Sequence, residues 1–270
     1  MKTKYKIFVA KIILKILNIF ITNPKFVHQV NGIKWNFDLN EGIDLNLYIF
    51  KKFEYEIINS SKKLNFKKNS SIIDIGANSG IQTLQFANTF KKSKIYAIEP
   101  TDFAFNKLKK NIILNQKLSS RIKIFQAFIT NKKIKPSKVY SSWNLKSKNV
   151  HKNHYGSHKS TKFAKVFSLD KFIIDKKIKN ISLIKIDVDG NELFVFKSAI
   201  NTLRKYKIPI IMELAPYLYK ENNYSLDDLI KTLKSYNYSF FDINNLMKIN
   251  DIYYFASNIP YGSSKNILIK

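Results

Sequence analysis

The stretch from residue 71 to residue 100, SIIDIGANSGIQTLQFANTFKKSKIYAIEP, constrains the fold more than any other part of the chain. It opens with a short apolar run that contains Asp74 and ends in a glycine turn, and a segment with helical periodicity follows. A second apolar run then closes on Glu99 and Pro100. The order strand, tight turn, helix, strand is typical of the first half of a nucleotide-binding α/β sheet.

The residues of this turn indicate which nucleotide it binds. Gly76 and Gly80 let the backbone bend sharply and approach a ligand, because they lack a Cβ atom. Glu99, at the tip of the second strand, can accept hydrogen bonds from both hydroxyls of a ribose, worth roughly 1.5–3 kcal/mol. A dinucleotide fingerprint needs a glycine near Asn78 to admit a pyrophosphate, and Asp74 would repel one. The acidic turn instead favours S-adenosylmethionine (SAM), which carries a sulfonium and an ammonium and no phosphate.

At these residues the chain resembles a known family. DIGANSG (74–80), AIEP (97–100) and IKIDVDGNE (184–192) together are similar to motifs of the FkbM family of SAM-dependent methyltransferases. The resemblance covers roughly residues 53–211, with a weaker tail, and departs mildly at Asp189, where the family more often has glutamate. It implies a class I methyltransferase fold and O-methylation of a hydroxyl on a glycan, a lipid-linked sugar or a secondary metabolite.

The predicted fold is a seven-stranded, mostly parallel Rossmann-like sheet with one antiparallel edge strand, which suits a chain able to bury one full core. An N-terminal helix and a β-hairpin precede it, and Asn31-Gly32 marks the hairpin turn. The last two strands are expected at 239–243 and 252–256. We divide the chain into an amphipathic helix (1–24), a hairpin and helical lead-in (25–66) and a SAM-dependent methyltransferase domain (67–270).

The predicted cofactor site extends from the turn to the ends of the neighbouring strands. A strand over 122–129 is expected to end beside adenine, which places Ala127 there. Glu54 and Glu56 fall where the family has a glutamate upstream of the turn, and they are interpreted either as pocket wall or as a solvated helix face. The candidate cofactor-binding residues are Asp74, Gly76, Ala77, Asn78, Gly80, Thr83, Glu99, Pro100, Ala127 and Asp187.

Carboxylates at the carboxyl ends of two later strands are the candidate catalytic groups. Asp187 follows the apolar run 181–186, and Glu213 lies in the run 208–214, so both fall at the same sheet edge. Such acids are costly to crowd without a cation, which SAM or a metal would supply. Asp187 is the first candidate for the base that takes the acceptor proton. We assign no metal to the predicted site, and a divalent ion bound between Asp187 and Glu213 is the alternative.

A long segment, 131–163, is rich in Lys, Ser and Asn and is predicted to form an irregular loop on the substrate side. It supplies the second candidate base, His154, with His158 as its alternative. Ser141, Ser142 or Tyr155 could contact the acceptor. Its histidine spacing could hold zinc in principle, but no cysteine or adjacent carboxylate completes such a site.

The net charge of +28 raises the question of a nucleic-acid partner. Only Arg121 and Arg204 are arginines, whereas base readout leans on bidentate arginine, and the lysines are spread along the chain. Nucleic acid is therefore an unlikely partner, and the expected partner is a small-molecule or glycan acceptor. The alternatives are a nucleic-acid methyltransferase, a nicotinamide oxidoreductase, and a non-catalytic binding module tethered to a membrane or a partner.

In residues 5–22 the last four polar positions recur every three or four residues, which is the spacing of one face of a helix. Lys11, Lys15, Asn18 and Thr22 form one stripe, and Ile, Leu and Phe fill the rest. Two interior lysines disfavour a bilayer-spanning helix. The helix is expected to dock on the domain, to form a homodimer or to contact a membrane surface. The absence of cysteine fits a reducing compartment, so we expect a cytoplasmic protein, with peripheral membrane contact as an option.

Overall fold

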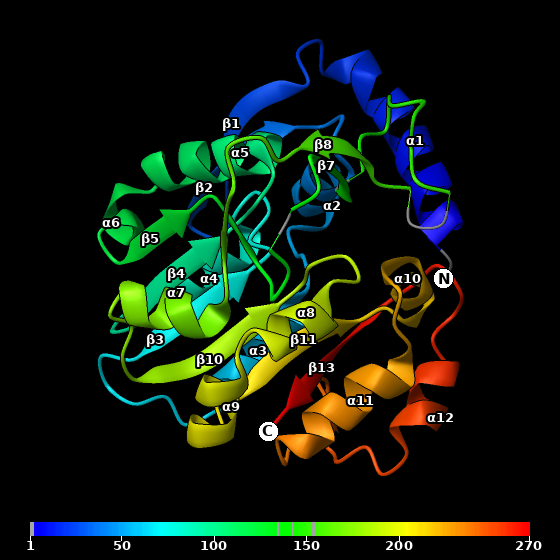
Figure 1. The fold of residues 1–270 in the computed structure, drawn as a ribbon. Helices are drawn as coiled ribbons and strands as arrows, with labels where there is room; N and C mark the ends of the chain where they lie inside the picture. The colour runs from blue at the N-terminus through cyan, green and yellow to red at the C-terminus, as the bar shows by residue number, and fades with distance from the viewer. Residues whose placement is uncertain (1–2, 134, 142, 153–154) are drawn as a thin grey trace.

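The computed structural model describes residues 3–133, 135–141, 143–152 and 155–270. Its centre is a seven-stranded sheet (Figure 1). In spatial order the strands are β12 (Phe240–Asp242), β13 (Lys265–Ile269), β11 (Ile210–Leu214), β10 (Ile181–Ile186), β3 (Ser71–Ile75), β4 (Lys94–Ile98) and β5 (Ile122–Phe125). β13 runs antiparallel to β11 and β12, and the pairs from β11 to β5 are parallel.

This architecture confirms the predicted fold class. The antiparallel strand, β13, lies one place in from the edge, between β11 and the edge strand β12. The central strand β3 is buried along its whole length. A parallel strand covered on both faces reads as a continuous apolar run, which explains why the run from residue 71 was recognisable in the sequence.

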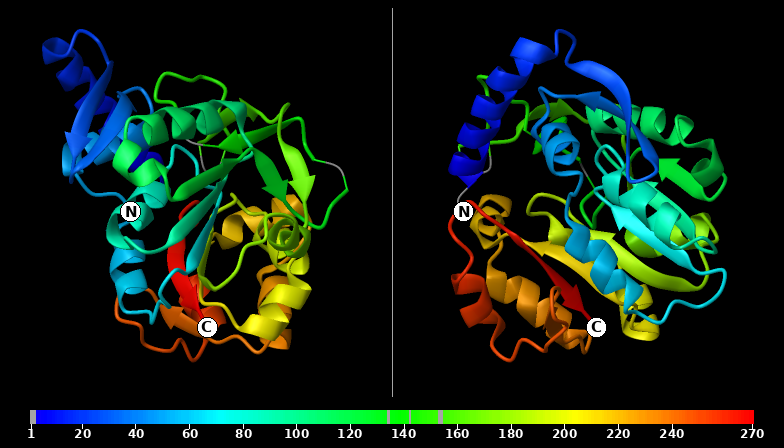
Figure 2. Two further views of the ribbon diagram at one scale, coloured as in Figure 1. Left: turned by 90° about the vertical axis from the view of Figure 1, so that its left-hand side faces the viewer. Right: turned by 180° about the vertical axis from the view of Figure 1, so that it is seen from behind.

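Helices cover both faces of the sheet (Figures 1 and 2). The face that carries Ile73 packs against helices from the second half of the chain, and the face that carries Ile72 packs against α3, α4 and α6. The helices that follow the hairpin are α2 (Gly42–Phe50), α3 (Tyr55–Lys62), α4 (Ile81–Thr89), α5 (Asp102–Ile113), α6 (Gln116–Ser119), α7 (Leu169–Asp175), α8 (Glu192–Lys197), α9 (Ile200–Tyr206), α10 (Pro216–Tyr219), α11 (Leu226–Ser235) and α12 (Ile252–Ser257), with a 3₁₀ turn, η1 (Lys220–Asn222).

The N-terminal region consists of α1 (Thr3–Phe20) and a hairpin of β1 (Lys25–Val30) and β2 (Ile33–Asp38). Asn31 and Gly32 both have positive φ, +52° and +78°, as the predicted two-residue turn requires. Leu14 of α1 is buried in a cluster formed with the hairpin and α2. Within the part of the chain that the structure describes, no helix is long and apolar enough to span a bilayer.

The segment predicted as an irregular loop contains regular structure. β7 (Lys138–Ser141) pairs antiparallel with β8 (Ser157–Ser160). The predicted strand 122–129 divides at Gln126, and its second part, β6 (Ala127–Ile129), leaves the main sheet to pair with β9 (Lys165–Phe167). Both two-stranded pairs lie beyond the carboxyl end of β5, where they can cover a ligand at the sheet edge.

One predicted strand is wrong. Residues 252–256 form α12 rather than a strand, because Asp251 accepts hydrogen bonds from the N–H groups of Tyr253 and Tyr254 and caps the helix. The seventh strand is β13, whose residues Ile267, Leu268 and Ile269 are fully buried. Aromatic residues favour strands, which is why the sequence predicted one here. The segment lies outside the sheet, and the cap by Asp251 stabilises it as a helix.

Candidate active site at the carboxyl edge of the sheet

Two cavities lie side by side at the carboxyl ends of β3, β4 and β10. The larger has a volume of about 670 Å³ and the smaller about 470 Å³. Five residues line both of them: Gly76, Glu99, Ser141, Asp187 and Asp189. The cavities therefore meet at the strand ends, which is where open α/β sheets bind their ligands.

The turn after β3 is fixed by its neighbours. The N–H groups of Gly76 and Ala77 both donate to the carbonyl oxygen of Ile98, at 2.9 and 3.0 Å. Gly76 has a φ of +79°, and a Cβ atom there would lie 1.7 Å from the backbone oxygen of Asp187. Only glycine fits this position, so the ends of three strands are locked together around it.

Glu99 is held with its carboxylate between the two cavities. One oxygen accepts from the N–H of Asn78 at 2.9 Å, and the other from the N–H and hydroxyl of Thr101 at 2.8 and 2.6 Å. Burial raises the pKa of Glu99, while the hydrogen bonds from Thr101 and Asn78 oppose that rise. Three of about four lone-pair positions are used, which leaves room for a ligand hydroxyl.

Lys185 connects the turn after β3 with the acid after β10. Its ammonium lies 3.1 Å from Asp187 and 3.6 Å from Asp74, and it donates to the carbonyl of Gly76 at 3.2 Å. The lysine is 3% exposed. Burial lowers the pKa of Lys185, but the carboxylates of Asp187 and Asp74 outweigh it and hold the pKa above its ordinary value. Lys185 is therefore a buried cation that orients Asp187.

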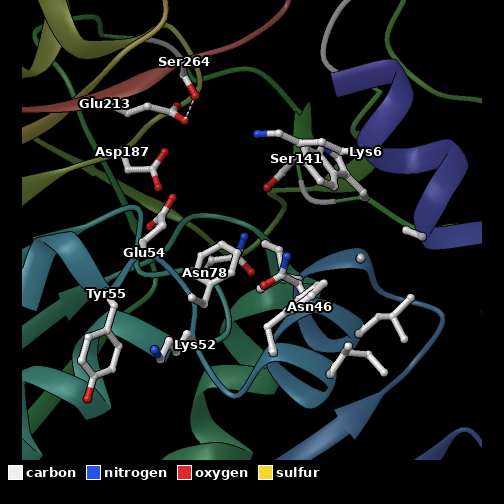
Figure 3. A pocket seen from close by; sticks show the side chains of 18 of the residues that line it. Lys6, Asn46, Lys52, Glu54, Tyr55, Asn78, Ser141, Asp187, Glu213 and Ser264 are labelled. Carbon is white, nitrogen blue, oxygen red and sulfur yellow. Dashed lines mark hydrogen bonds between the residues drawn. The ribbon is translucent and has the colours of Figure 1, made fainter. Parts of the chain in front are cut away.

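The larger cavity is acidic although the chain is strongly basic. Six of the chain's 19 acidic residues line it, whereas the basic residues that line it, among those the structure describes, are Lys6 and Lys52. Figure 3 shows three of the acids together on one side of the cavity, with Lys6 and Ser141 on the other. The six acids are Glu54, Glu56, Glu99, Asp187, Asp189 and Glu213. Such a concentration of carboxylates fits a cationic ligand.

Three of these acids could also hold a metal ion. Asp187, Asp189 and Glu213 each offer one carboxylate oxygen, and these oxygens all lie within 4.8 Å of one another. Glu213 additionally accepts a short hydrogen bond from Ser264. Burial and the neighbouring Asp187 raise the pKa of Glu213. A cation of either kind, organic or metallic, would relieve this repulsion.

We expect the ligand-free protein to lose stability as the pH rises from about 5 to about 8. Burial, with repulsion from Asp187, raises the pKa of Glu54 from 4.5 to about 8, and burial raises that of Glu192 to about 7. Both bind their proton more tightly in the folded state. Their stabilising contribution is therefore complete at low pH and disappears as the pH passes these values. Melting temperatures across this range check it; Glu54→Gln should flatten the decline, and a constant melting temperature would contradict it.

The predicted cofactor residues fall into two groups. Gly76, Asn78, Glu99, Pro100, Ala127 and Asp187 line one or both cavities. Asp74, Ala77, Gly80 and Thr83 do not, because they are packed behind the turn. Thr83 donates to Asp74 at 2.5 Å, and Asp74 faces Lys185. These four residues therefore stabilise the turn and do not form the cavity surface.

Two of the predicted catalytic residues, Asp187 and Glu213, lie at the cavities. Asp187 lies at the junction of the cavities, and Glu213 lines the larger one. His154 lies outside the described residues. His158 is exposed on β8, where its ring lies against Tyr140 at 3.8 Å between centroids, tilted by 34°. A different histidine, His151, lines the smaller cavity and lies 2.7 Å from Glu221.

The segment 131–163 lies against both cavities. Several of its residues line the smaller cavity, including Lys135, Val139 and Tyr140. Ser141 lines both cavities and Trp143 lines the larger one. The position of this segment therefore does not assign it to one cavity alone.

Several lining or supporting residues carry no role in the sequence-based prediction. Tyr217, Trp143 and Ser264 line the larger cavity, and no pattern around them marks a site. Lys185 did carry a signal. A lysine within the apolar run 181–186 must be buried, and a buried lysine needs a carboxylate partner.

Comparison with known proteins decides the family. The model of the methyltransferase FkbM domain matches residues 74–240, which is more than half of the chain. The chain belongs to the FkbM methyltransferase family. This confirms the resemblance carried by the turn and by the segment 184–192, and with it the predicted methyltransferase class and SAM as the cofactor. A search of curated proteins found no match.

Solved structures with a similar architecture include other methyltransferases. Methyltransferase FkbM from Methylobacillus flagellatus KT is 16% identical, with a TM-score of 0.49 over 84% of this chain and 52% of that one. TYW2 from P. horikoshii, solved with MeSAdo, is 16% identical, with a TM-score of 0.45 over 98% and 82%. A SAM-dependent O-methyltransferase from Thermotoga maritima is 11% identical, with a TM-score of 0.45 over 91% and 77%. The chain thus spans about half the length of the FkbM structure.

The residues of this FkbM family member fit the cofactor. The smaller cavity has apolar walls from Ile98, Pro100 and Ala127, which suit a flat adenine ring. Glu99 stands at the junction as a hydrogen-bond acceptor for one ribose hydroxyl, and the acids of the larger cavity suit a cationic end group. A pyrophosphate would meet these carboxylates and be repelled.

Proposed function

We propose that this FkbM-family protein transfers a methyl group from SAM to a hydroxyl oxygen of an acceptor that enters the larger cavity. The acceptor class is a glycan, a lipid-linked sugar or a secondary metabolite. One observation carries the proposal: the two cavities meet at Glu99 and Asp187, so a ligand in the smaller cavity can present a reactive group to a ligand in the larger one.

The proposed binding residues divide the cofactor between the cavities. Pro100 and Ala127 would hold the adenine, and Glu99 the ribose. Gly76 and Asn78, with the carboxylate of Asp187, would hold the charged methionine end. When bound, SAM supplies a methyl group on a positively charged sulfur. Holding two reactants in line contributes about 7–11 kcal/mol to lowering a barrier, so positioning is the main task of these residues.

Asp187 is the proposed base. A hydroxyl oxygen attacks well only as its proton leaves, and a carboxylate at the cavity junction can accept that proton and return it to water. Lys185 lies 3.1 Å from Asp187 and orients the carboxylate. General-base assistance of this kind is worth about 10²–10⁴-fold in rate. Glu213 is the second carboxylate within reach of the acceptor.

Calorimetric titration of the full chain tests the cofactor assignment. SAM should bind at one saturable site, and NAD should not bind. Glu99→Gln should weaken SAM binding at least about tenfold, because a charge-assisted bond is lost. Glu56→Gln, in the same cavity but away from the junction, is the matched control and should change the affinity less. Binding of NAD alone would favour an oxidoreductase, and binding of neither would favour a non-catalytic module.

The chemistry of the product tests the acceptor atom. The protein is incubated with methyl-labelled SAM and a panel of sugar, uronic acid, polyol and phenol acceptors, and labelled products are treated with mild base. A methyl ether on a hydroxyl oxygen survives this treatment, whereas a methyl ester is hydrolysed. Label that is released by base would contradict transfer to a hydroxyl.

Removing divalent metal ions should leave methyl transfer unchanged. The proposed cation among Asp187, Asp189 and Glu213 is the methionine end of SAM, not a metal. Turnover and SAM affinity are measured before and after dialysis against EDTA and metal-free buffer. A loss of activity that Mg²⁺ or Mn²⁺ restores would show that these three carboxylates hold a metal ion.

A further inference from the structure

The first helix has two apolar faces, and the protein buries only one. On the inner face, Leu14 is 5% exposed, and Ile7, Ala10, Ile13 and Leu17 are partly buried against the same cluster. This confirms docking of the helix on its own domain. Figures 1 and 2 show α1 at the edge of the molecule, outside α2 and the hairpin.

The outer face of α1 is also apolar. Its seven large side chains are between 44% and 78% exposed, and they recur at helical spacing on the side opposite Leu14. They are Tyr5, Phe8, Val9, Ile12, Ile16, Ile19 and Phe20. We call these seven residues the outer face. A contiguous exposed apolar surface of this kind marks an interaction site.

Charge identifies the occupant of the outer face. Exposed lysines border it on both sides, with Lys11 and Lys15 along one border and Lys6 along the other. The helix has no acidic residue between Thr3 and Phe20. We propose that the outer face of α1 binds the surface of an anionic membrane, with its apolar side chains in the interface and these lysines at the headgroups.

A second copy of the chain fits this face less well. A pair of outer faces would bring the bordering lysines of two molecules together, and each molecule has a net charge of +28. Like charges at an interface oppose association, whereas an anionic surface attracts them. The same lysines thus favour a membrane and disfavour a homodimer.

The outer face is continuous with the mouth of the larger cavity. Val9 belongs to the outer face and also lines that cavity, as does Lys6 at its border. Phe50 of α2, 60% exposed, is a further apolar residue that lines the cavity. Figure 3 shows α1 as the wall opposite Asp187 and Glu213. Binding through the outer face therefore sets the cavity mouth beside the membrane surface.

Vesicle flotation of the full-length protein tests the proposal. The protein should float with phosphatidylcholine vesicles that contain about one third phosphatidylglycerol, and should bind vesicles of phosphatidylcholine alone at least about tenfold more weakly. Phe8→Asp with Ile16→Asp should reduce binding to the anionic vesicles at least about tenfold. The matched control is Ile174→Asp on α7, an apolar side chain that is even more exposed, at 73%, and this substitution should leave binding unchanged. Lys11→Glu with Lys15→Glu should weaken binding most at low salt.

Two further measurements keep the outcome interpretable. Melting temperature and SAM affinity of each variant report folding, and neither requires methyl transfer, so failure of the proposed function would not affect this test. Flotation of the Phe8→Asp, Ile16→Asp variant at the level of the unaltered protein would overturn the proposal. So would a dimer of the unaltered protein, measured by light scattering, that the same variant dissociates while flotation is absent.

Discussion

Gly76→Ala should remove SAM binding and destabilise the fold by about 3 kcal/mol or more. The added Cβ would lie 1.7 Å from the backbone oxygen of Asp187, and backbone cannot rotate away as a side chain can. The φ of +79° adds strain of its own. Relief requires the turn after β3 and the end of β10 to separate, which moves both walls at the junction of the cavities. Calorimetry with SAM and denaturant unfolding measure the two effects.

Gly32→Ala is the matched control for this substitution. Gly32 has nearly the same φ, +78°, but a Cβ atom added there, in the hairpin turn, would meet nothing within 4 Å. It should therefore cost only the backbone strain, about 1–2 kcal/mol, and leave SAM affinity unchanged. Equal effects at Gly76 and Gly32 would show that the contact with Asp187 has no influence on the site.

Lys185→Met should destabilise the protein by about 3–5 kcal/mol at neutral pH. The substitution leaves Asp74 fully buried without its cation. Asp74 Oδ1 has no hydrogen-bond partner among the described residues, so Lys185 at 3.6 Å is what balances its charge. An uncompensated buried carboxylate is costly until it takes up a proton, so the loss should shrink as the pH falls. Denaturant unfolding at several pH values measures this.

The control for Lys185→Met is an ion pair of the same length at the surface. Lys171 lies 3.1 Å from Asp175, as Lys185 lies from Asp187, but the Lys171 side chain is 66% exposed and that of Lys185 is 4% exposed. Lys171→Met should therefore change stability little. The double variant Lys185→Met, Asp74→Asn should recover part of the loss. A single variant as stable as the unaltered protein would refute the role of Lys185.

The central part of the fold could be predicted because its strands are buried on both faces. The runs at 71–75, 94–98 and 181–186 are mostly apolar, and a glycine turn or an acid marks where each ends. The end of the chain was harder. The segment 252–256 has the composition of a strand, yet the Asp251 cap makes it helical, while 265–269 carries a lysine and an asparagine at its start.

The cofactor side of the site was more predictable than the acceptor side. Gly76 and Glu99 belong to one contiguous motif, so their proximity follows from local geometry. The role of Asp74 was harder to place, since the sequence shows that it precedes the turn but not that it faces the distant Lys185 rather than the cavity. Trp143 and Tyr217 reach the larger cavity from distant segments, and no local pattern reports such a meeting.

The two walls of the larger cavity are built differently. On one wall, the strand ends interlock through Gly76, Ile98 and Asp187, so a change at one is transmitted to the others. On the opposite wall, α1 packs on α2 and the hairpin through apolar side chains, and the start of α2 is joined to residues 143–145 by backbone hydrogen bonds from Gly42 to Trp143 and from Leu145 to Asn40. That second wall is modular. Redesign of acceptor preference should begin there, because its residues can be exchanged without disturbing the interlocked half.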